Sequence, residues 1–225
     1  MAKNTSSKET ILTSIRNALL NTTKLPFPNL EAVDNIYNVT EDHLDILFAQ
    51  ELKNVNGEFI YCENEKECVE NIKELVMQNG WENVFCFEER LKQLFDKHQF
   101  INYETKKDIT EADAGIIMCE ALVARTGSIL LSSKQESGRT LPIYPTYNIV
   151  VASTQQLVLD ITDAIAVVRK KYDGNMPSMI NLATGPSRTA DIEKTLVLGA
   201  HGPRGVYVFL IDNLQIDWMK NGSTQ

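Results

Sequence analysis

The stretch GEFIYCENEKECVENIKELVMQNGWENVFCF at residues 57–87 decides the fold class, because its hydrophobic pattern changes from that of a strand to that of a helix and back. Two short apolar runs, at 58–62 and 83–87, have the length and composition of strands. Between them, residues 64–78 carry apolar side chains at helical spacing, start at Asn64 with a capping pattern and stop at Asn79-Gly80. A strand, a helix and a second strand in this order are typical of a parallel sheet. We therefore expect an α/β fold with a mostly parallel central sheet.

Upstream of this stretch, the chain predicts a helical arm. Residues 6–22 read as an amphipathic helix opened by the capping box Ser6-x-x-Glu9, and a second helix is expected at about 40–53. Two prolines within 25–29 break regular structure between these helices. We divide the chain into an N-terminal helical arm and linker, 1–55, and a main domain, 56–225. Downstream, we expect a short helix near 88–97, strands at 114–119, 128–132, 148–152, 179–183 and 206–211, and a long helix at 154–172.

Composition limits the class of partner. The 225 residues carry a net charge of -8, which disfavours nucleic acid and anionic membrane surfaces. No apolar run approaches the roughly 18 residues that span a bilayer, and the N-terminus has no apolar signal core, so we expect a cytoplasmic protein. The spacing of the four cysteines matches no CxxC pair, no zinc knuckle and no iron-sulfur run, and in a reducing compartment we expect free thiols. Cys62, Cys68 and Cys86 fit the core, whereas Cys119 lies nearer the candidate site.

The residues best suited to chemistry follow the apolar run 179–183, in the loop Thr-Gly-Pro-Ser-Arg-Thr-Ala-Asp-Ile-Glu at 184–193. Gly185 allows a tight turn and a close approach to a ligand. Ser187 and Thr189 can cap a short following helix whose amino end would face an anion, and Arg188 offers a fork for a carboxylate or phosphate. The alternative is a capped surface turn in which Arg188 pairs with Asp191 or Glu193.

A second part of this motif is His201, held between Gly199 and Gly202-Pro203. A positioned imidazole can transfer a proton near neutral pH, although a turn-shaping histidine would look the same. Two further clusters join a glycine, a hydroxyl and a guanidinium: residues 124–128, with Thr126 and Gly127, and residues 137–142, with Arg139. The three clusters would suit a pocket for an acidic ligand if the fold brings them together; otherwise the second is a hairpin turn and the third a mobile loop.

The Gly185 to His201 pattern, followed by a hydrophobic strand, resembles the lactate-utilization (LUD-domain) family, and within it the lactate-utilization protein C members. The resemblance covers roughly residues 45–212. It implies a fold like ribose-5-phosphate isomerase and the CoA-transferases, a three-layer sandwich with helices on both sides of the sheet. It also implies a cytoplasmic role in converting L-lactate to pyruvate with two partner proteins, one of them an iron-sulfur protein. One departure is Arg125, which stands where the family commonly has an acidic residue.

Oxidation of a 2-hydroxy acid needs a base and an electron acceptor, and the chain offers candidates only for the base. It has no GxGxxG loop, no Walker A loop and no iron-sulfur cysteine spacing, and we expect no covalently bound cofactor. The leading hypothesis is a non-redox component that binds a small carboxylate or a phosphorylated cofactor. Arg188, Ser187 and Thr189 would hold this anion, His201 would move a proton, and Asp191 would orient His201 or Arg188. The alternatives are a scaffolding subunit that docks the iron-sulfur partner, and an independent acyl or sugar-phosphate transferase or isomerase with Glu120 or Glu193 as its carboxylate.

Overall fold

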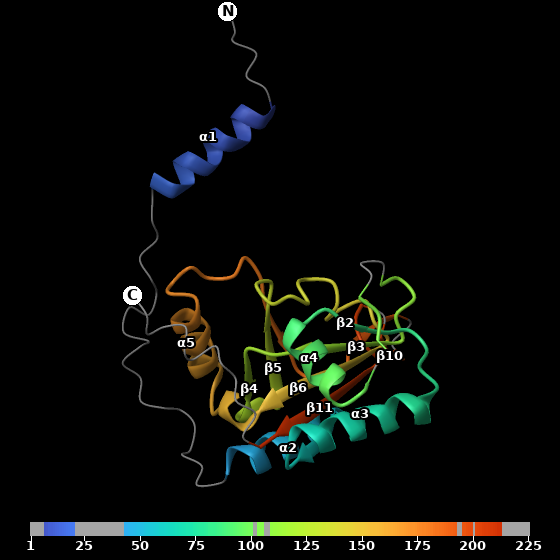
Figure 1. The fold of residues 1–225 in the computed structure, drawn as a ribbon. Coiled ribbons are helices and arrows are strands. Elements are labelled where there is room, and N and C mark those ends of the chain that lie inside the picture. Colours follow the sequence, from blue (N-terminus) through green and yellow to red (C-terminus); the bar gives the residue numbers. More distant parts are fainter. Residues whose placement is uncertain are drawn as a thin grey trace, which may run out of the picture. The chain divides into compact units, whose positions relative to one another are not determined.

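A computed structural model describes residues 7–20, 43–100, 103–105, 109–192, 195–199 and 201–212; at 190–192 and 195–198 it describes the backbone alone. The chain divides into two compact units, Met1–Glu41 and Asp42–Gln225. In the first unit, the predicted amphipathic helix is present as α1 (Ser7–Leu20), and none of its residues is buried (Figure 1). Ser6 and the proline-containing linker lie outside the described residues. The helices in the described residues are all too short or too polar to cross a bilayer.

The second unit is built on a five-stranded sheet in the order β1 (Glu58–Cys62), β11 (Gly205–Ile211), β6 (Tyr147–Ser153), β3 (Ala114–Met118) and β2 (Val84–Cys86). Every neighbouring pair in this central sheet is parallel, as the strand–helix–strand rhythm predicts. All carboxyl ends therefore lie along one edge of the sheet, the carboxyl edge, and all amino ends along the opposite amino edge. The expected α/β fold with a parallel central sheet flanked by helices is confirmed.

Helices α3 (Glu65–Asn79) and α4 (Glu89–Lys97) share one core cluster with alternate residues of the central strands. The predicted helix signals hold for α3, because the Asn64 side chain accepts a hydrogen bond from the Glu67 amide and Gly80 closes the helix with a φ of 63°. The residues that point to the other face of the sheet pack with helix α2 (Leu44–Asn54) through Phe48 and Leu52. The predicted second helix of the arm is therefore part of the main unit, because its apolar stripe completes this core.

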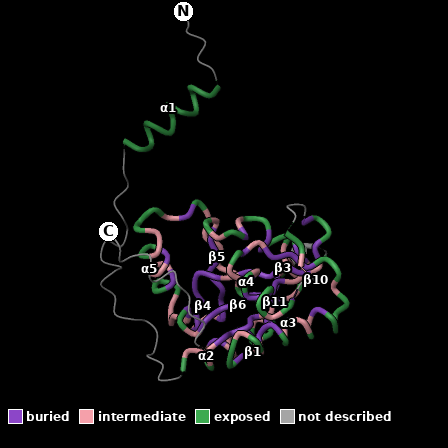
Figure 2. The backbone as a smooth tube through the Cα atoms, in the orientation of Figure 1, coloured by how far each residue is buried: buried purple, intermediate pink, exposed green. Residues whose placement is uncertain are grey.

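A second, smaller sheet covers the same face as α2. It has the order β7 (Leu157–Val158), β4 (Ala121–Val123), β5 (Ser128–Ser132) and β8 (Ile180–Ala183), and β5 runs antiparallel to both β4 and β8. Helix α5 (Ile161–Lys171) packs on its outer side through Ala164 and Val168. Figure 2 shows the inner strands of both sheets, among them β3, β4, β5 and β6, as largely buried, whereas the edge strands β1, β7 and β8 are more exposed.

Two sequence predictions are wrong in detail. The predicted helix at 154–172 begins only at Ile161, because Leu157 and Val158 pair with Leu122 and Val123 as strand β7. Strand pairing here overrides a helical apolar spacing that would have continued through 154–158. Likewise, no helix follows Ser187: the chain forms the hairpin of β9 (Arg188–Ile192) and β10 (Thr195–Leu198). The positive end of a helix dipole is therefore not available to an anion at this loop.

Candidate functional site

The predicted motif loop connects β8 to the β9–β10 hairpin, and the chain then returns through 199–204 to β11. The two halves of the motif meet, because the Ser187 amide donates to the Pro203 carbonyl at 2.8 Å and the Gly199 amide donates to the Ser187 carbonyl at 2.9 Å. The Arg204 amide in turn donates to the Thr146 carbonyl at 2.7 Å, next to the first residues of β6 and β11. The motif loop therefore lies at the amino edge of the central sheet.

The second cluster joins this loop through a chain of hydroxyl groups. The Thr126 Oγ1 lies 2.7 Å from the Ser128 Oγ, which lies 2.8 Å from the Thr184 Oγ1. Thr126 belongs to a short 3-10 turn, Ala124–Thr126, that links β4 to β5, whereas Thr184 directly follows β8. The antiparallel pairing of Ile129 with Ala183 places these two turns side by side. Three segments far apart in sequence are thus assembled here.

Both glycines assigned to ligand binding sit against helix α2. A Cβ on Gly127 would lie 2.3 Å from the Leu52 nitrogen, and a Cβ on Gly185 would lie 2.2 Å from the Val55 oxygen. Both also have a positive φ, 59° and 70°, which favours glycine. The close approach that these glycines allow is therefore to the last turn of α2, which fixes the position of the loop.

Arg188 is exposed, and its guanidinium donates a hydrogen bond of 3.0 Å to the Val55 carbonyl, just beyond the carboxyl end of α2. A cation at this position also complements the helix dipole. This partner is a neutral carbonyl, and a guanidinium carries five donors, so among the described residues the side chain retains both charge and donors for a ligand. His201 is exposed on the adjoining turn, and Thr189 is half-buried in β9. The side chain of Asp191 lies outside the described residues, so its proposed pairing with His201 or Arg188 stays a prediction.

The third cluster lies elsewhere. The Ser137 amide donates to the Glu88 Oε1 at 3.4 Å and the Ser137 hydroxyl donates to the same atom, which places this cluster beyond the end of β2. Arg139 donates to the Ser178 Oγ at 2.7 Å, ahead of β8. These positions are at the carboxyl edge, and the strands between the two edges are up to seven residues, or about 20 Å, long. The structure thus unites the first two clusters and separates Arg139 from them.

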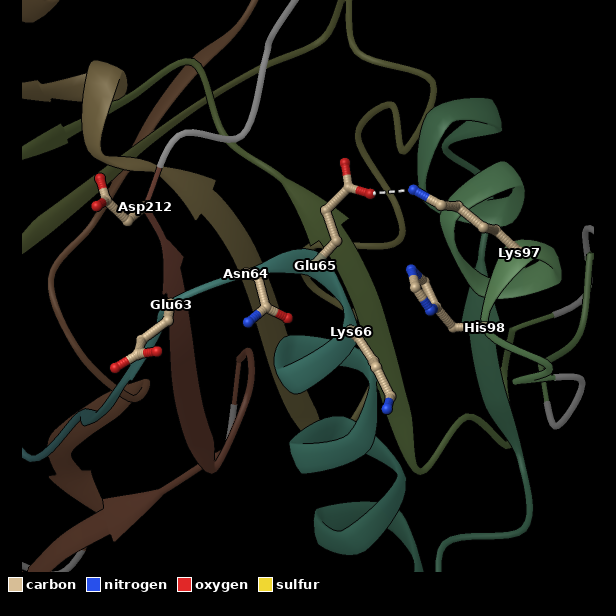
Figure 3. Close-up of a pocket in the computed structure, with 7 residues that line it drawn as sticks. All are labelled: Glu63, Asn64, Glu65, Lys66, Lys97, His98 and Asp212. Atoms are coloured by element: carbon tan, nitrogen blue, oxygen red, sulfur yellow. Dashed lines mark hydrogen bonds and ion pairs between the residues drawn. The ribbon is translucent and has the colours of Figure 1, made fainter.

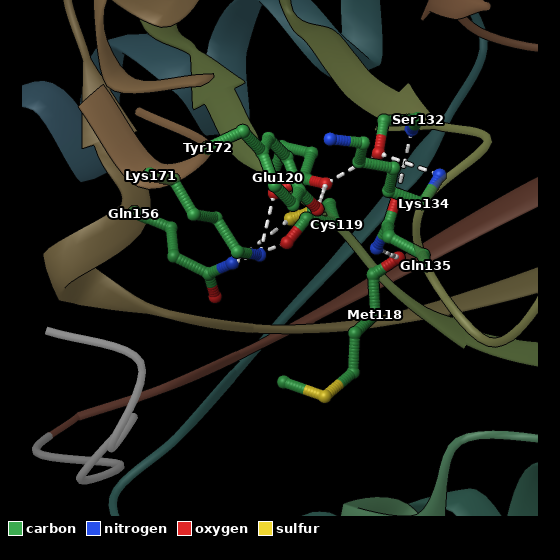
Figure 4. Close-up of polar contacts among 9 residues, drawn as sticks. All are labelled: Met118, Cys119, Glu120, Ser132, Lys134, Gln135, Gln156, Lys171 and Tyr172. Atoms are coloured by element: carbon green, nitrogen blue, oxygen red, sulfur yellow. Dashed lines mark hydrogen bonds and ion pairs between the residues drawn. The ribbon is translucent and has the colours of Figure 1, made fainter. Parts of the chain in front are cut away.

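A buried polar network occupies the carboxyl edge, around Glu120 (Figure 4). Glu120 lies between β3 and β4, directly before Ala121, and is 1% exposed. Its Oε1 accepts hydrogen bonds from the Ser132 hydroxyl at 2.6 Å and the Tyr172 hydroxyl at 2.7 Å, and its Oε2 pairs with the Lys171 ammonium at 2.7 Å. Burial and the hydrogen bond to Glu120 raise the pKa of Tyr172 above its usual value. In the sequence, the sign of this network is that Glu120 is a single carboxylate between two apolar runs.

Two further charged groups are held by local partners. Burial raises the pKa of the Glu88 carboxyl, although the two hydrogen bonds from Ser137 favour its charged form. Arg125, the departure from the family pattern, donates from Nε to the Asp160 Oδ1 at 2.6 Å and from a terminal nitrogen to Oδ2 at 3.3 Å. This two-point ion pair fixes the amino end of α5, where Asp160 is the capping residue. Arg125 therefore forms a structural ion pair and does not supply the acid-base group that an acidic residue could supply at this position.

A depression of about 400 Å³ opens at the carboxyl ends of β1 and β11 (Figure 3). The Lys97 ammonium pairs with the Glu65 carboxylate at 2.8 Å across its rim. Its lining carries three carboxylates and two lysines, so it offers no excess of positive charge for an anion; the lining residues are Glu63, Asn64, Glu65, Lys66, Lys97, His98 and Asp212. Within the described ranges, no group of three potential metal-ligating side chains converges here or elsewhere.

Comparison with known proteins places this geometry in a family. The lactate utilization protein C of Bacillus licheniformis is 37% identical over 105 residues, which cover 45% of this chain and 44% of that protein. The protein of the same name from Shouchella clausii is 30% identical over 155 residues, 63% of this chain and 68% of that protein. The match thus spans less than half the length of the first of these relatives.

A crystal structure of a DUF162 family protein from Deinococcus radiodurans has a similar fold, with a TM-score of 0.55 and 16% identity. The superposition covers 77% of this chain and 99% of that protein. The sequence model of the LUD domain matches residues 47–211, a range that begins within α2 and ends with the last residue of β11. This range contains both sheets, the motif loop and the Glu120 network, and the chain therefore belongs to the LUD domain family.

Proposed function

We propose that this protein is a non-redox component of an L-lactate utilization system, in which lactate is oxidised to pyruvate. The support for this role is the similarity to two proteins named lactate utilization protein C. Lactate oxidation releases two electrons, and the sequence contains none of the dinucleotide, nucleotide or iron-sulfur motifs that would receive them. In this proposal the electrons pass to an iron-sulfur partner, while this chain binds and positions the small carboxylate.

The observation that carries the binding site is the assembly of three segments around the exposed guanidinium of Arg188. The hydroxyl chain from Thr126 to Thr184 and the hydrogen bond from Ser187 to Pro203 hold these segments together. Arg188 would bind the carboxylate of lactate or pyruvate, or the phosphate of a cofactor, and Ser187 and Thr189 would add hydrogen bonds. His201, on the same surface, would exchange the hydroxyl proton. Because the Arg188 side chain is already held against α2, it loses less conformational entropy when a ligand binds.

Isothermal titration of the purified protein with lactate, pyruvate and CoA tests this site. We expect Arg188→Ala to weaken binding of the true ligand by at least about tenfold, since a hydrogen bond to a charged group contributes about 1.5–3 kcal/mol. Arg204→Ala is the matched control, because Arg204 is an exposed arginine of the adjoining turn. Arg188→Lys keeps the positive charge but loses the planar guanidinium, which can donate two hydrogen bonds to one carboxylate or phosphate. Equal dissociation constants for wild type and Arg188→Ala would exclude the proposed role of Arg188.

Scaffolding is the second candidate function, and helix α1 is the observation that favours it. Its apolar residues Ile11, Leu12, Ile15 and Leu19 are all exposed. A helix with an exposed apolar stripe can dock on a partner protein. Deletion of residues 1–41 tests this without harming the main unit, whereas deletion through residue 55 would remove Phe48 and Leu52 from its core. Loss of the iron-sulfur partner in co-purification, with lactate binding intact, would favour scaffolding over ligand binding.

A transferase or isomerase is the third candidate, and Glu120 is the carboxylate that would serve it. Its position just beyond a central parallel strand is a common one for ligand sites in α/β sheets. In the structure both of its oxygens are engaged by Ser132, Tyr172 and Lys171, so a reacting carboxylate would have to exchange one of these partners. Mass spectrometry after incubation with acyl-CoA would detect a covalent adduct on Glu120, and an unmodified protein would argue against this function. Glu193 lies outside the described residues.

A further inference from the structure

Strand β1 forms one edge of the central sheet and is the least buried of its strands. Phe59 and Ile60 are half-buried, and Tyr61 is 44% exposed (Figure 2). The strand at the opposite edge, β2, has all of its residues buried. Within the described residues, β11 is the only strand that pairs with β1. The outer backbone N–H and C=O groups of β1 are therefore available to a further extended segment.

The opposite edge of the sheet shows what such a segment does. Glu104 lies beside β2 and forms an isolated parallel bridge to Phe85. Its amide donates to the Val84 carbonyl at 2.6 Å, and its carbonyl accepts from the Cys86 amide at 3.1 Å. A short extended segment thus satisfies backbone groups on the outer side of β2. The part of the chain that the structure describes contains no equivalent strand beside β1.

A groove of about 440 Å³ runs along the open edge of β1, and we call it the edge groove. Its lining joins apolar side chains of the sheet and of α3 with polar side chains of α3; among these residues are Ile60, Leu75, Tyr207, Phe209, Asn71 and Gln78. Ile60, Leu75 and Tyr207 are only partly buried, and they pack against the core cluster that α3 shares with the sheet. An apolar side chain placed in the edge groove would therefore extend this core and remove apolar surface from water.

The chain reaches this edge directly after β11. The Asp212 amide donates to the Cys62 carbonyl at 3.0 Å, so the chain leaves β11 across the carboxyl end of β1. Crossing β1 to its outer side takes two strand spacings, about 10 Å, which about three residues span. A segment that begins near residue 214 can then run back along β1 in the antiparallel direction.

The residues that follow have the pattern of a strand with one buried face. Leu214, Ile216 and Trp218 are apolar, and Gln215 and Asp217 between them are polar. This alternation has a period of two, which puts the three apolar side chains on one face of a strand. The segment 214–218 has as many residues as β1, which has five. It lies outside the described residues and beyond the LUD domain match, which ends at residue 211.

We propose that residues 214–218 pair with the outer edge of β1 as an additional antiparallel strand, with Leu214, Ile216 and Trp218 in the edge groove. The outer N–H and C=O groups of β1 then gain partners, as those of β2 do at Glu104. The short connection from Asp212 gives the segment an effective concentration of the order of millimolar at this edge. A second copy of the chain at lower concentration competes poorly for the same edge, so the segment also protects β1 from edge-to-edge association.

Hydrogen exchange of the full-length protein, followed residue by residue by NMR, tests the proposal. We expect amides within 214–218 to exchange at least about tenfold more slowly than in a free peptide of the same sequence. Ile216→Asp should abolish this protection, because it places a charge in the edge groove. Gln215→Asp is the matched control, since it introduces the same charge on the opposite face of the strand, and it should keep the protection.

The edge groove offers a second pair of variants. Leu75→Asp places a charge in its lining and should release the segment. Met77→Asp, at a position of α3 that is 78% exposed, should leave the protection unchanged. If Leu75→Asp fails to fold, the variants at positions 215 and 216 still decide the question, because those positions lie outside the LUD domain match.

Three results would overturn the proposal. The first is exchange of residues 214–218 at the free-peptide rate in the wild-type protein. The second is equal protection in Ile216→Asp and Gln215→Asp. The third is protection that increases with protein concentration, which would show that a second copy, and not the chain's own segment, occupies the edge of β1.

Discussion

Replacement of Gly127 by alanine should destabilise the protein strongly, and the structure allows the size of the effect to be estimated. The new Cβ would lie 2.3 Å from the Leu52 nitrogen and 2.5 Å from the Glu51 carbonyl carbon, both backbone atoms of α2. Relieving this overlap requires the helix to move, and overpacking of this kind costs about 1–3 kcal/mol. The φ of 59° adds about 1–2 kcal/mol for a residue with a Cβ.

The expected total is therefore about 2–5 kcal/mol in the free energy of unfolding, or roughly 4–20 °C in Tm for a domain of this size. Thermal and urea unfolding followed by circular dichroism measure both quantities. Gly138→Ala is the matched control, because Gly138 has a similar φ of 62° but a Cβ there would have no neighbour within 4 Å. It should lose only the backbone contribution, about 1–2 kcal/mol.

Equal losses in Gly127→Ala and Gly138→Ala would refute the packing argument, because the clash with α2 is the difference between the two sites. A second informative outcome is a Gly127→Ala variant that is as stable as the control and has lost lactate binding. In that case the close approach at Gly127 would serve the ligand, as the sequence motif suggested, and α2 would not be seated against it as described.

Three further predictions concern charged groups. Glu120→Gln should lower the free energy of unfolding by about 3–5 kcal/mol, measured in urea, because it leaves the Lys171 ammonium partly buried without its counter-ion. A double-mutant cycle of Arg125→Met and Asp160→Asn should give a coupling of about 1–3 kcal/mol, and a value near zero would contradict the two-point geometry. For Glu88, whose folded pKa is raised above the ordinary 4.5, the stabilising contribution is present below pH 4.5 and is lost as the pH rises through the folded value. The difference in the free energy of unfolding between wild type and Glu88→Gln should therefore decline as the pH rises from 4.5. A difference that grows with pH would show that the folded pKa of Glu88 is lowered instead.

The local patterns that the sequence predicts well are those with a local physical cause. Helix α3 begins where Asn64 caps it and ends where Gly80 adopts a positive φ, and both signals are readable without any tertiary contact. The parallel sheet follows from the alternation of short apolar runs with this amphipathic helix. The resemblance carried by the Gly185 to His201 motif likewise needs only the residues themselves, and the LUD domain match confirms the family.

Predictions for segments that pair as strands were the ones that changed. Residues 157–158 have a helical apolar spacing, yet they pair with β4. Pairing with the edge of a sheet stabilises these residues more than one further turn of helix would. The residues after Ser187 have capping signals, yet they form a hairpin whose register joins Arg188 to Leu198. In the first case the partner strand is distant in sequence, and in the second it is the next strand of a hairpin; capping signals and apolar spacing contain no information about either pairing.

The sequence by itself determined the α/β class, the caps of α3, the family and the set of residues that we propose to bind an anion. Only the tertiary structure decided which of these residues meet: the turn with Thr126 and the motif loop with Arg188 lie together at the amino edge. Arg139 instead binds Ser178, and its neighbour Ser137 binds Glu88, at the carboxyl edge. The physical reason is that β5 and β8 run antiparallel, so the turns at their two ends lie at opposite edges of the molecule's core. Strand direction is a property of the assembled sheet, and residue spacing along one chain does not specify it.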